Sequence, residues 1–188
     1  HGVIGTLHNL RHRSTEELEA ELLRHAPETP MSLVLPCLYS ELEGDALTGI
    51  VDKLAKVPYL EEIIIGLDAA DREQFERARD FFSKLPQRHS ILWNDGPRLL
   101  EIDRRLTTEN LSPLERGKGR NVWYCLGYFL ASARSKVVAL HDCDILTYER
   151  DMPARLFYPL VHPDMDYVFC KGYYYRAAQG RLNGRVFR

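Results

Sequence analysis

Short apolar runs alternate with helical patterns along most of this chain, and this alternation constrains its fold most strongly. Four runs indicate strands, at residues 31–38, 60–68, 89–95 and 137–140, and the last should be buried on both faces. Strands that alternate with helices predict a parallel sheet covered on both sides and joined by right-handed crossovers. The predicted class is therefore α/β, with a Rossmann-like, mostly parallel sheet flanked by helices.

Helices are predicted where apolar residues recur at intervals of three and four positions. Two capping-box patterns mark helix starts, one at Ser14 and one at Asp71. Further helices should follow residue 43 and span 98–106 and 147–157. The helix that begins near residue 120 should pack on the sheet through an apolar stripe. That stripe consists of Val122, Leu126, Phe129, Leu130 and Ala133.

Three local features add finer expectations. Pro36 should end the first strand or force a bulge, because proline donates no hydrogen bond to a ladder. The helix at 147–157 should end near Pro159 and Pro163, because proline disfavours a helix interior. The aromatic segment 166–176 is predicted to be a strand.

The composition is that of an ordinary globular domain. The chain has 188 residues, 45% of them hydrophobic and 28% charged, and its formal net charge is −2. This balance argues against a broad basic face for nucleic acid. No apolar run approaches the roughly 18 residues of a membrane span, and no signal-peptide core is present near His1. We therefore expect a soluble, cytoplasmic protein.

The chain ends and the cysteines carry separate expectations. The chain begins without Met and stops at residues 184–188 within a patterned segment, so we expect a fragment with a truncated C-terminus. The four cysteines lie in or beside apolar segments and form no C-x-x-C pair. Buried reduced thiols are the expected state, and a zinc site is the alternative. The cysteines are Cys37, Cys125, Cys143 and Cys170.

Asp142 and Asp144 follow directly after the strand at 137–140. Side chains two positions apart in an extended chain share a face, so both carboxylates should point toward the ligand-binding edge of an open α/β sheet. Two adjacent carboxylates suit a hard cation such as Mg²⁺ or Mn²⁺, which would hold a diphosphate. An Asp-x-Asp triplet also arises by chance among 27 acidic residues, and its position after a strand is what favours a metal.

A glycine-rich basic segment at 115–120 opens the next helix. Gly117 and Gly119 permit close approach of backbone N–H groups, and Lys118 lies between them at a helix N-terminus that favours anions. A phosphate or carboxylate clamp is one interpretation, and a solvated helix start with a glycine hinge is the other. The spacing is not that of a P-loop, and no G-x-G-x-x-G dinucleotide motif follows the first strand.

Six motifs in this order resemble those of the GT-A glycosyltransferases, and within them the retaining glucosyl-3-phosphoglycerate and mannosylglycerate synthases. The motifs are 33–38 with Glu41, 64–68, 117–119 with Trp123, 142–144, 171–174 and 184–186. The resemblance implies the GT-A fold in three parts. These are an N-terminal helical extension at 1–30, a nucleotide-sugar-binding half at 31–145, and the start of an acceptor-binding half at 146–188.

The resemblance also implies roles for individual residues. Asp142 and Asp144 would hold Mg²⁺ or Mn²⁺, and Lys118 would meet the nucleotide, so Asp144 and Lys118 would serve catalysis. The nucleotide-sugar pocket would be formed by Pro36, Cys37, Leu38, Glu41, Asp68, Gly117, Lys118 and Asp142. The acceptor would meet Lys171, Gly184, Arg185 and Val186. Arg185 suits a phosphate or carboxylate because a guanidinium can grip either with two hydrogen bonds.

The implied reaction moves glucose from UDP-glucose to 3-phosphoglycerate with retention at the anomeric carbon. The implied role is compatible-solute or polysaccharide-precursor synthesis, and the implied assembly is a homodimer. Tyr39 and Ser40 stand before Glu41 where the family carries Asn-Glu, and Phe187 stands where phosphoglycerate synthases carry Thr. Phe187 favours a non-phosphorylated acceptor, so a GDP-mannose-dependent synthase acting on D-glycerate stays open. An inverting transferase and a non-catalytic nucleotide-sugar-binding module are further alternatives. The family's histidine metal ligand would lie beyond residue 188.

Overall fold

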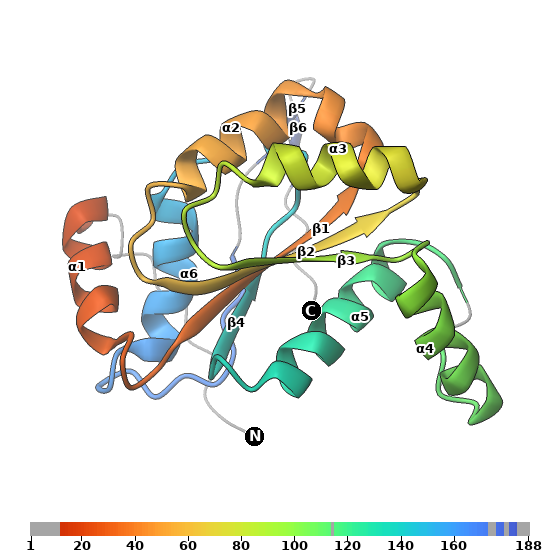
Figure 1. Cartoon of the computed structure of the whole chain (residues 1–188). Coiled ribbons are helices and arrows are strands. Elements are labelled where there is room, and N and C mark those ends of the chain that lie inside the picture. Colours follow the sequence, from red (N-terminus) through yellow and green to blue (C-terminus); the bar gives the residue numbers. More distant parts are fainter. Residues whose placement is uncertain (1–11, 114, 173–175, 179–180, 184–188) are drawn as a thin grey trace.

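Four parallel strands form the sheet on which the rest of the chain is built (Figure 1). The computed structural model describes residues 12–113, 115–172, 176–178 and 181–183. In spatial order the strands are β3 (His89–Trp93), β2 (Leu60–Asp68), β1 (Met31–Leu38) and β4 (Val137–Leu140). All three pairings are parallel, which confirms the predicted sheet. A separate antiparallel pair joins β5 (Arg176–Ala178) to β6 (Arg181–Asn183).

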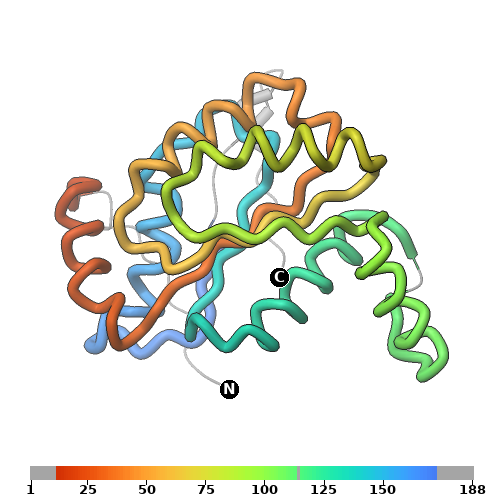
Figure 2. Tube along the Cα trace, in the orientation of Figure 1, coloured from red at the N-terminus to blue at the C-terminus, as the bar shows by residue number. Residues whose placement is uncertain are grey.

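Helices cover both faces of the sheet, as the view in Figure 1 and the Cα trace in Figure 2 show. They are α1 (Thr15–His25), α2 (Asp45–Leu54), α3 (Arg72–Phe82), α4 (Pro97–Thr108), α5 (Lys118–Ser132) and α6 (Asp151–Val161), with a 3-10 helix, η2 (Tyr39–Glu43). Along β1, Leu33 and Leu35 face a large core shared with α1, α2, α3 and α6. Val34 faces α5 on the other side. Among the described residues, no helix is long and apolar enough to cross a membrane.

Both predicted capping boxes are present. The Ser14 hydroxyl accepts a hydrogen bond from the Glu17 backbone N–H at 3.1 Å, at the start of α1. The Asp71 carboxylate accepts one from the Gln74 N–H at 2.8 Å, at the start of α3. Each side chain satisfies a backbone donor that has no partner within its helix. These two helix starts were thus encoded locally.

The prediction that the strand at 137–140 is buried on both faces is wrong. β4 lies at the edge of the sheet, where only Ala139 is buried and Leu140 is 37% exposed. β1 is the central strand, and its residues 31–37 are all buried. A continuous apolar run does not reveal its place in the strand order, because that order depends on pairing between distant segments.

The face that α5 turns to the sheet also differs from the prediction. Leu126 and Leu130 are 37% and 73% exposed, whereas Phe129 is partly buried. The residues that α5 buries are Asn121, Tyr124 and Cys125. Asn121 Nδ2 donates to the Gly66 carbonyl of β2 at 2.8 Å, so the helix lies close to the strand backbone. Asn121 and Cys125, and not the predicted leucines, contact the strand at Gly66, where even an added Cβ would meet both of them.

Pro36 neither ends β1 nor forces a bulge beside it. The strand continues to Leu38, with Pro36 opposite Gly66, and the register shift lies at its other end. The Val34 carbonyl accepts a hydrogen bond from the His141 N–H, just beyond β4. Pro36 lies two positions further along β1, so its backbone nitrogen faces the same side of the strand. Because the ladder between β1 and β4 ends before Pro36, the missing N–H of the proline costs no ladder hydrogen bond.

In the C-terminal third, α6 ends at Val161, between Pro159 and Pro163 as predicted, although it begins at Asp151 and not at residue 147. The prediction of a strand from residue 166 onward is wrong. The segment 166–172 is irregular rather than a strand, and Val168 and Phe169 are 96% and 75% exposed. Aromatic side chains favour a strand only where a neighbouring strand pairs with it. Among the described residues, pairing in this part of the chain begins at Arg176.

Candidate functional site

The carboxyl ends of the four parallel strands lie at one edge of the sheet (Figure 1). Several polar residues follow these strand ends. Glu41 follows β1 in η2, Asp68 is the last residue of β2, and Asp142 lies just beyond β4. In an open α/β sheet this edge is where ligands bind. Three of the residues singled out in the sequence therefore share one edge, although 101 positions separate the first from the last (142 minus 41).

Lys118 and Asp142 are in direct contact at this edge. The Lys118 ammonium donates a hydrogen bond to Asp142 Oδ1, which joins the start of α5 to the turn after β4. Both side chains are partly exposed, at 55% and 40%, so a ligand can reach them. Gly117 precedes the helix with φ +135°, a conformation that favours glycine. The glycine thus sets the direction in which Lys118 enters the site.

Asp142 and Asp144 supply a donor set that fits a hard divalent cation. Asp142 is half-buried and Asp144 exposed, and both follow an edge strand. Carboxylate oxygens are the ligands that Mg²⁺ and Mn²⁺ prefer, and Mg²⁺ often binds through one or two carboxylates together with substrate phosphates. In the described part of the chain, neither aspartate joins a close group of three metal-binding side chains. Such a pair leaves coordination positions for a diphosphate.

Cys143, between the two aspartates, points the other way into the protein. It is 2% exposed and lies close to Cys37 and Glu41, whose ligand atoms are all within 4.8 Å of one another. A hydrogen bond with the Cys37 side chain, followed by burial, raises the pKa of the Cys143 thiol well above its ordinary value. All four cysteines are free thiols, as predicted, and Cys170 is only partly buried.

Glu41 holds the turn that leaves β1. Its Oε2 accepts a hydrogen bond from the Leu38 backbone N–H at 2.7 Å. The side chain of Leu38 is 46% exposed beside it, whereas Cys37 is fully buried. Of the residues expected to line the nucleotide pocket here, Leu38 and Glu41 reach the surface, whereas Pro36 and Cys37 are buried.

Asp95 organises the neighbouring loops beyond β2 and β3. Its Oδ2 accepts from the Ala70 N–H at 3.2 Å, and Arg116 lies 3.7 Å from its Oδ1. The Trp93 indole donates to the Ala70 carbonyl at 2.8 Å and stacks on Phe75. The loop that follows Asp68 is therefore tied to the segment that precedes Lys118.

Asp103 is a structural residue of this region that the sequence did not reveal. It accepts hydrogen bonds from Ser112 at 2.5 Å, from Tyr124, and from Arg120 at 3.0 Å. The Arg120 side chain is only 10% exposed, so one of the basic residues near the clamp is engaged in folding. These bonds fasten the first turns of α5 to α4. The amphipathic pattern of α4 carries no signal for them, because all three partners lie on other segments.

We expect Asp103→Asn to lower the free energy of unfolding by about 2 kcal/mol at pH 7, because a charged acceptor of three hydrogen bonds is lost. The bonds to Ser112 and Tyr124, then Arg120, lower the pKa of Asp103 below 3.8. A lowered pKa stabilises the fold above pH 3.8, and this stabilisation is lost as the pH falls through the folded-state pKa. Urea unfolding of the parent and of Asp103→Asn, measured from pH 7 to 3, should therefore show the difference between their free energies of unfolding shrinking at the acidic end.

Glu101→Gln on the same helix is the matched control. Glu101 pairs with Arg104 and Arg105 on the surface, where ion pairs contribute less than about 1 kcal/mol. If the difference in free energy of unfolding between Asp103→Asn and the parent stays constant down to pH 3, the role assigned to the carboxylate is contradicted.

His141 is a second residue without a sequence signal. It is 8% exposed, and its Nδ1 lies 2.8 Å from the Tyr148 hydroxyl. Burial lowers the pKa of His141 to about 4, so the ring is neutral at physiological pH. Although it adjoins Asp142, it adds no positive charge to the site.

The residues expected to bind the acceptor are only partly described. Lys171 is exposed in the irregular segment after α6. Gly184, Arg185 and Val186 lie outside the described residues. Their acceptor role stays a prediction.

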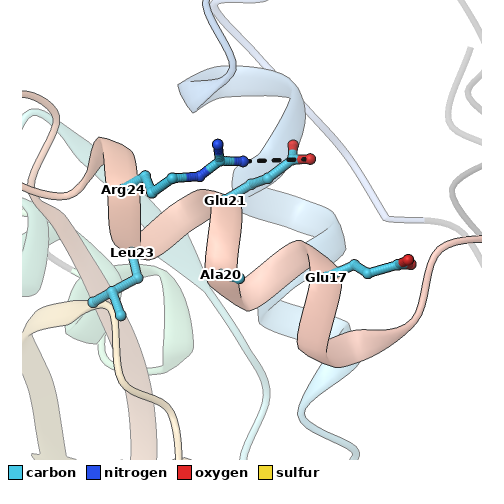
Figure 3. A pocket seen from close by; sticks show the side chains of 5 residues that line it. All are labelled: Glu17, Ala20, Glu21, Leu23 and Arg24. Carbon is cyan, nitrogen blue, oxygen red and sulfur yellow. Dashed lines mark ion pairs between the residues drawn. The ribbon is translucent and has the colours of Figure 1, made fainter.

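A surface depression along α1 lies away from this edge (Figure 3). It measures about 470 Å³ and is lined by Glu17, Ala20, Glu21, Leu23 and Arg24. Arg24 and Glu21 form an ion pair across it at 3.7 Å. Its lining comes from a single helix whose charges pair with each other, so the candidate site stays at the sheet edge.

Solved structures share this architecture. One crystal structure of glucosyl-3-phosphoglycerate synthase from Mycobacterium tuberculosis, in complex with Mn²⁺ and UDP-glucose, matches with a TM-score of 0.51 and 19% identity, over 78% of this chain and 44% of that one. Another, with Mn²⁺, UDP and phosphoglyceric acid, matches with a TM-score of 0.50 and 19% identity, over 77% and 43%. The fold is therefore the α/β GT-A fold of nucleotide-diphospho-sugar transferases.

Two curated proteins are related more closely in sequence. Glucosyl-3-phosphoglycerate synthase of Persephonella marina is 46% identical over 187 residues, which make up 100% of this chain and 46% of that protein. The synthase of Methanococcoides burtonii is 38% identical over 163 residues, or 85% and 40%. No protein-family model matches the chain. The chain is thus a homologue of glucosyl-3-phosphoglycerate synthases over its whole length, and it spans less than half the length of these relatives.

Proposed function

We propose that this chain carries the donor-binding half of a metal-dependent retaining glycosyltransferase that moves glucose from UDP-glucose to 3-phosphoglycerate. The contact between Lys118 and Asp142 is the observation that carries this proposal, because it joins a basic helix start to the acid pair at the ligand-binding edge. Residues 31–145 form the donor-binding half, and 146–188 begin the acceptor-binding half. The sequence relationship to two glucosyl-3-phosphoglycerate synthases supports the choice of donor and acceptor.

The site residues divide by the part of the donor that they meet. Asp142 and Asp144 hold Mg²⁺ or Mn²⁺, which when bound stabilises negative charge on the diphosphate. Lys118 supplies a second positive charge, and Gly117 lets the backbone approach the phosphates closely. The uridine and ribose lie against Leu38, Glu41 and Asp68 at the ends of the first two strands. Pro36 and Cys37, which the sequence also assigned to this pocket, are buried behind Leu38.

Retention follows from attack on the face that the diphosphate leaves. The 2-hydroxyl oxygen of the acceptor forms a bond to the anomeric carbon as the bond from that carbon to the UDP oxygen breaks. The hydroxyl proton passes to the departing phosphate. Lys118 stabilises the charge that grows on the leaving group, which is where electrostatic catalysis is most effective. No enzymic nucleophile is required.

On the acceptor side, only Lys171 lies within the described residues, and the other three lie outside them. Lys171, Gly184, Arg185 and Val186 grip the acceptor's carboxylate or phosphate, with Arg185 as the bidentate partner. Phe187, where phosphoglycerate synthases carry Thr, favours a second candidate, a GDP-mannose-dependent synthase acting on D-glycerate. The cytoplasmic location and the homodimer expected from the sequence stay predictions.

Calorimetric titration of UDP-glucose and GDP-mannose, each with and without Mn²⁺, tests the donor. We expect Mn²⁺-dependent binding of UDP-glucose alone. Binding of GDP-mannose alone would replace the leading proposal with the second candidate. Incubation with UDP-glucose and either 3-phosphoglycerate or D-glycerate, followed by mass spectrometry of the products, then tests the acceptor. Donor binding without transfer to either acceptor would reduce this chain to a nucleotide-sugar-binding module.

A further inference from the structure

Cys37, Glu41 and Cys143 form a cluster on the inner side of the sheet edge, which we call the thiol cluster. One ligand atom from each, two thiol sulfurs and a carboxylate oxygen, lies within 4.8 Å of the other two. Cys37 is the penultimate residue of β1, Glu41 lies in η2 and Cys143 follows β4. Three separate segments thus converge on one point.

The pairing of β1 with β4 explains why the two thiols meet. Val34 lies opposite Leu140 in the parallel register. The ladder ends at this pair, and Cys37 and Cys143 each lie three residues further along. Adjacent strands are about 4.8 Å apart, so side chains in such positions are near neighbours when they share a face. The two sulfurs lie within 4.8 Å of each other, so the thiols meet at this point.

Glu41 completes the cluster from a rigid turn. Its Oε2 is occupied by the Leu38 N–H at 2.7 Å, which fixes the carboxylate in place. A carboxylate has a second oxygen and several lone pairs, so it can ligate a metal while it keeps this bond. The side chain is only partly buried, whereas both cysteines are buried. A metal can therefore approach the cluster from the side of Glu41.

The chemistry of these donors differs from that of the aspartate pair. Soft thiolates select Zn²⁺ over Mg²⁺ and Mn²⁺, and three protein ligands with one water is a common zinc arrangement. Asp142 and Asp144 flank Cys143 but are half-buried and exposed, while Cys143 is 2% exposed. The two donor sets thus lie on opposite sides of one turn and suit different metals.

We propose that Cys37, Cys143 and Glu41 form a binding site for a thiophilic divalent cation, Zn²⁺, distinct from the Mg²⁺ or Mn²⁺ position at Asp142 and Asp144. A bound Zn²⁺ crosslinks β1, η2 and the turn after β4. This proposal does not depend on sugar transfer.

Titration with Zn²⁺ and with Co²⁺ alone tests the site, in a buffer with a phosphine reductant and without nucleotide. We expect one equivalent of Zn²⁺ to bind in the presence of excess Mg²⁺, and Co²⁺ to produce the near-ultraviolet charge-transfer band of thiolate ligation. Cys37→Ser and Cys143→Ser should each weaken Zn²⁺ binding at least about 100-fold, and Glu41→Gln about tenfold. Cys170→Ser, which removes a cysteine outside the cluster, is the matched control and should bind as the parent does.

Three outcomes would overturn the proposal. They are the absence of Zn²⁺ binding by the parent chain, a Co²⁺ spectrum without thiolate bands, and undiminished binding by a folded Cys37→Ser or Cys143→Ser protein. Far-ultraviolet circular dichroism checks folding. If both serine variants fail to fold, the Co²⁺ spectrum of the parent and the Glu41→Gln titration decide the question.

Discussion

The Asp144→Asn variant should bind UDP-glucose at least about 100-fold more weakly than the parent in the presence of Mn²⁺, a loss of roughly 3 kcal/mol. Asparagine keeps the size of the side chain but removes the charge that a hard cation requires. Asp144 is exposed in the turn after β4 and can change without disturbing the core. Calorimetry with and without Mn²⁺ measures the effect.

Without Mn²⁺ the parent and the Asp144→Asn variant should bind the donor equally, because the carboxylate acts only through the metal. The control is Asp80→Asn, which removes an exposed acid from α3, far from the turn, and should leave metal-dependent binding intact. Equal Mn²⁺-dependent binding by Asp144→Asn and the parent would refute the metal assignment.

The largest effect on stability is expected for Gly66→Ala, at about 3–5 kcal/mol of unfolding free energy. A Cβ at Gly66 would lie 1.8 Å from Asn121 Oδ1 and 2.6 Å from Cys125 Sγ, both in α5. The helix would have to move away from β2 and give up the hydrogen bond from Asn121 to the Gly66 carbonyl. Urea denaturation, followed by circular dichroism, gives the value.

Gly127→Ala in α5 itself is the matched control for this substitution. An added Cβ at Gly127 meets nothing within 4 Å, and alanine favours a helix interior by about 0.5–1 kcal/mol over glycine. We therefore expect opposite signs for the two glycine substitutions. A Gly66→Ala protein as stable as the parent would mean that α5 does not sit against β2 as described.

The strands and most helices could be predicted because their signals are local. Capping boxes at Ser14 and Asp71 bring side chain and backbone together within three residues. The apolar runs of β1 and β2 are long enough to indicate strands without knowledge of their neighbours. The α5 stripe failed because Gly66, which admits α5 so closely, is 55 positions away from Asn121.

The candidate site divides in the same way. The acid pair, the basic helix start and Glu41 were visible as motifs, since the chemistry of each depends on residue type and short spacing. The partners of Asp103 and the thiol cluster were not, because they join residues from separate segments. The spacing of cysteines along the chain said nothing of Cys37 and Cys143, whose sulfurs lie within 4.8 Å of each other just beyond the β1–β4 ladder.

By itself, then, the sequence determined the α/β alternation, the parallel sheet and the motifs at the ends of its strands, because these follow from local periodicity and capping. Only the tertiary structure decided that β4 is an edge strand, that α5 buries Asn121, Tyr124 and Cys125, and that Lys118 reaches Asp142 across 24 positions. The physical reason is that strand order and helix contact arise from pairings between distant segments. The free energy of those pairings depends on which surfaces meet, and no local pattern records it.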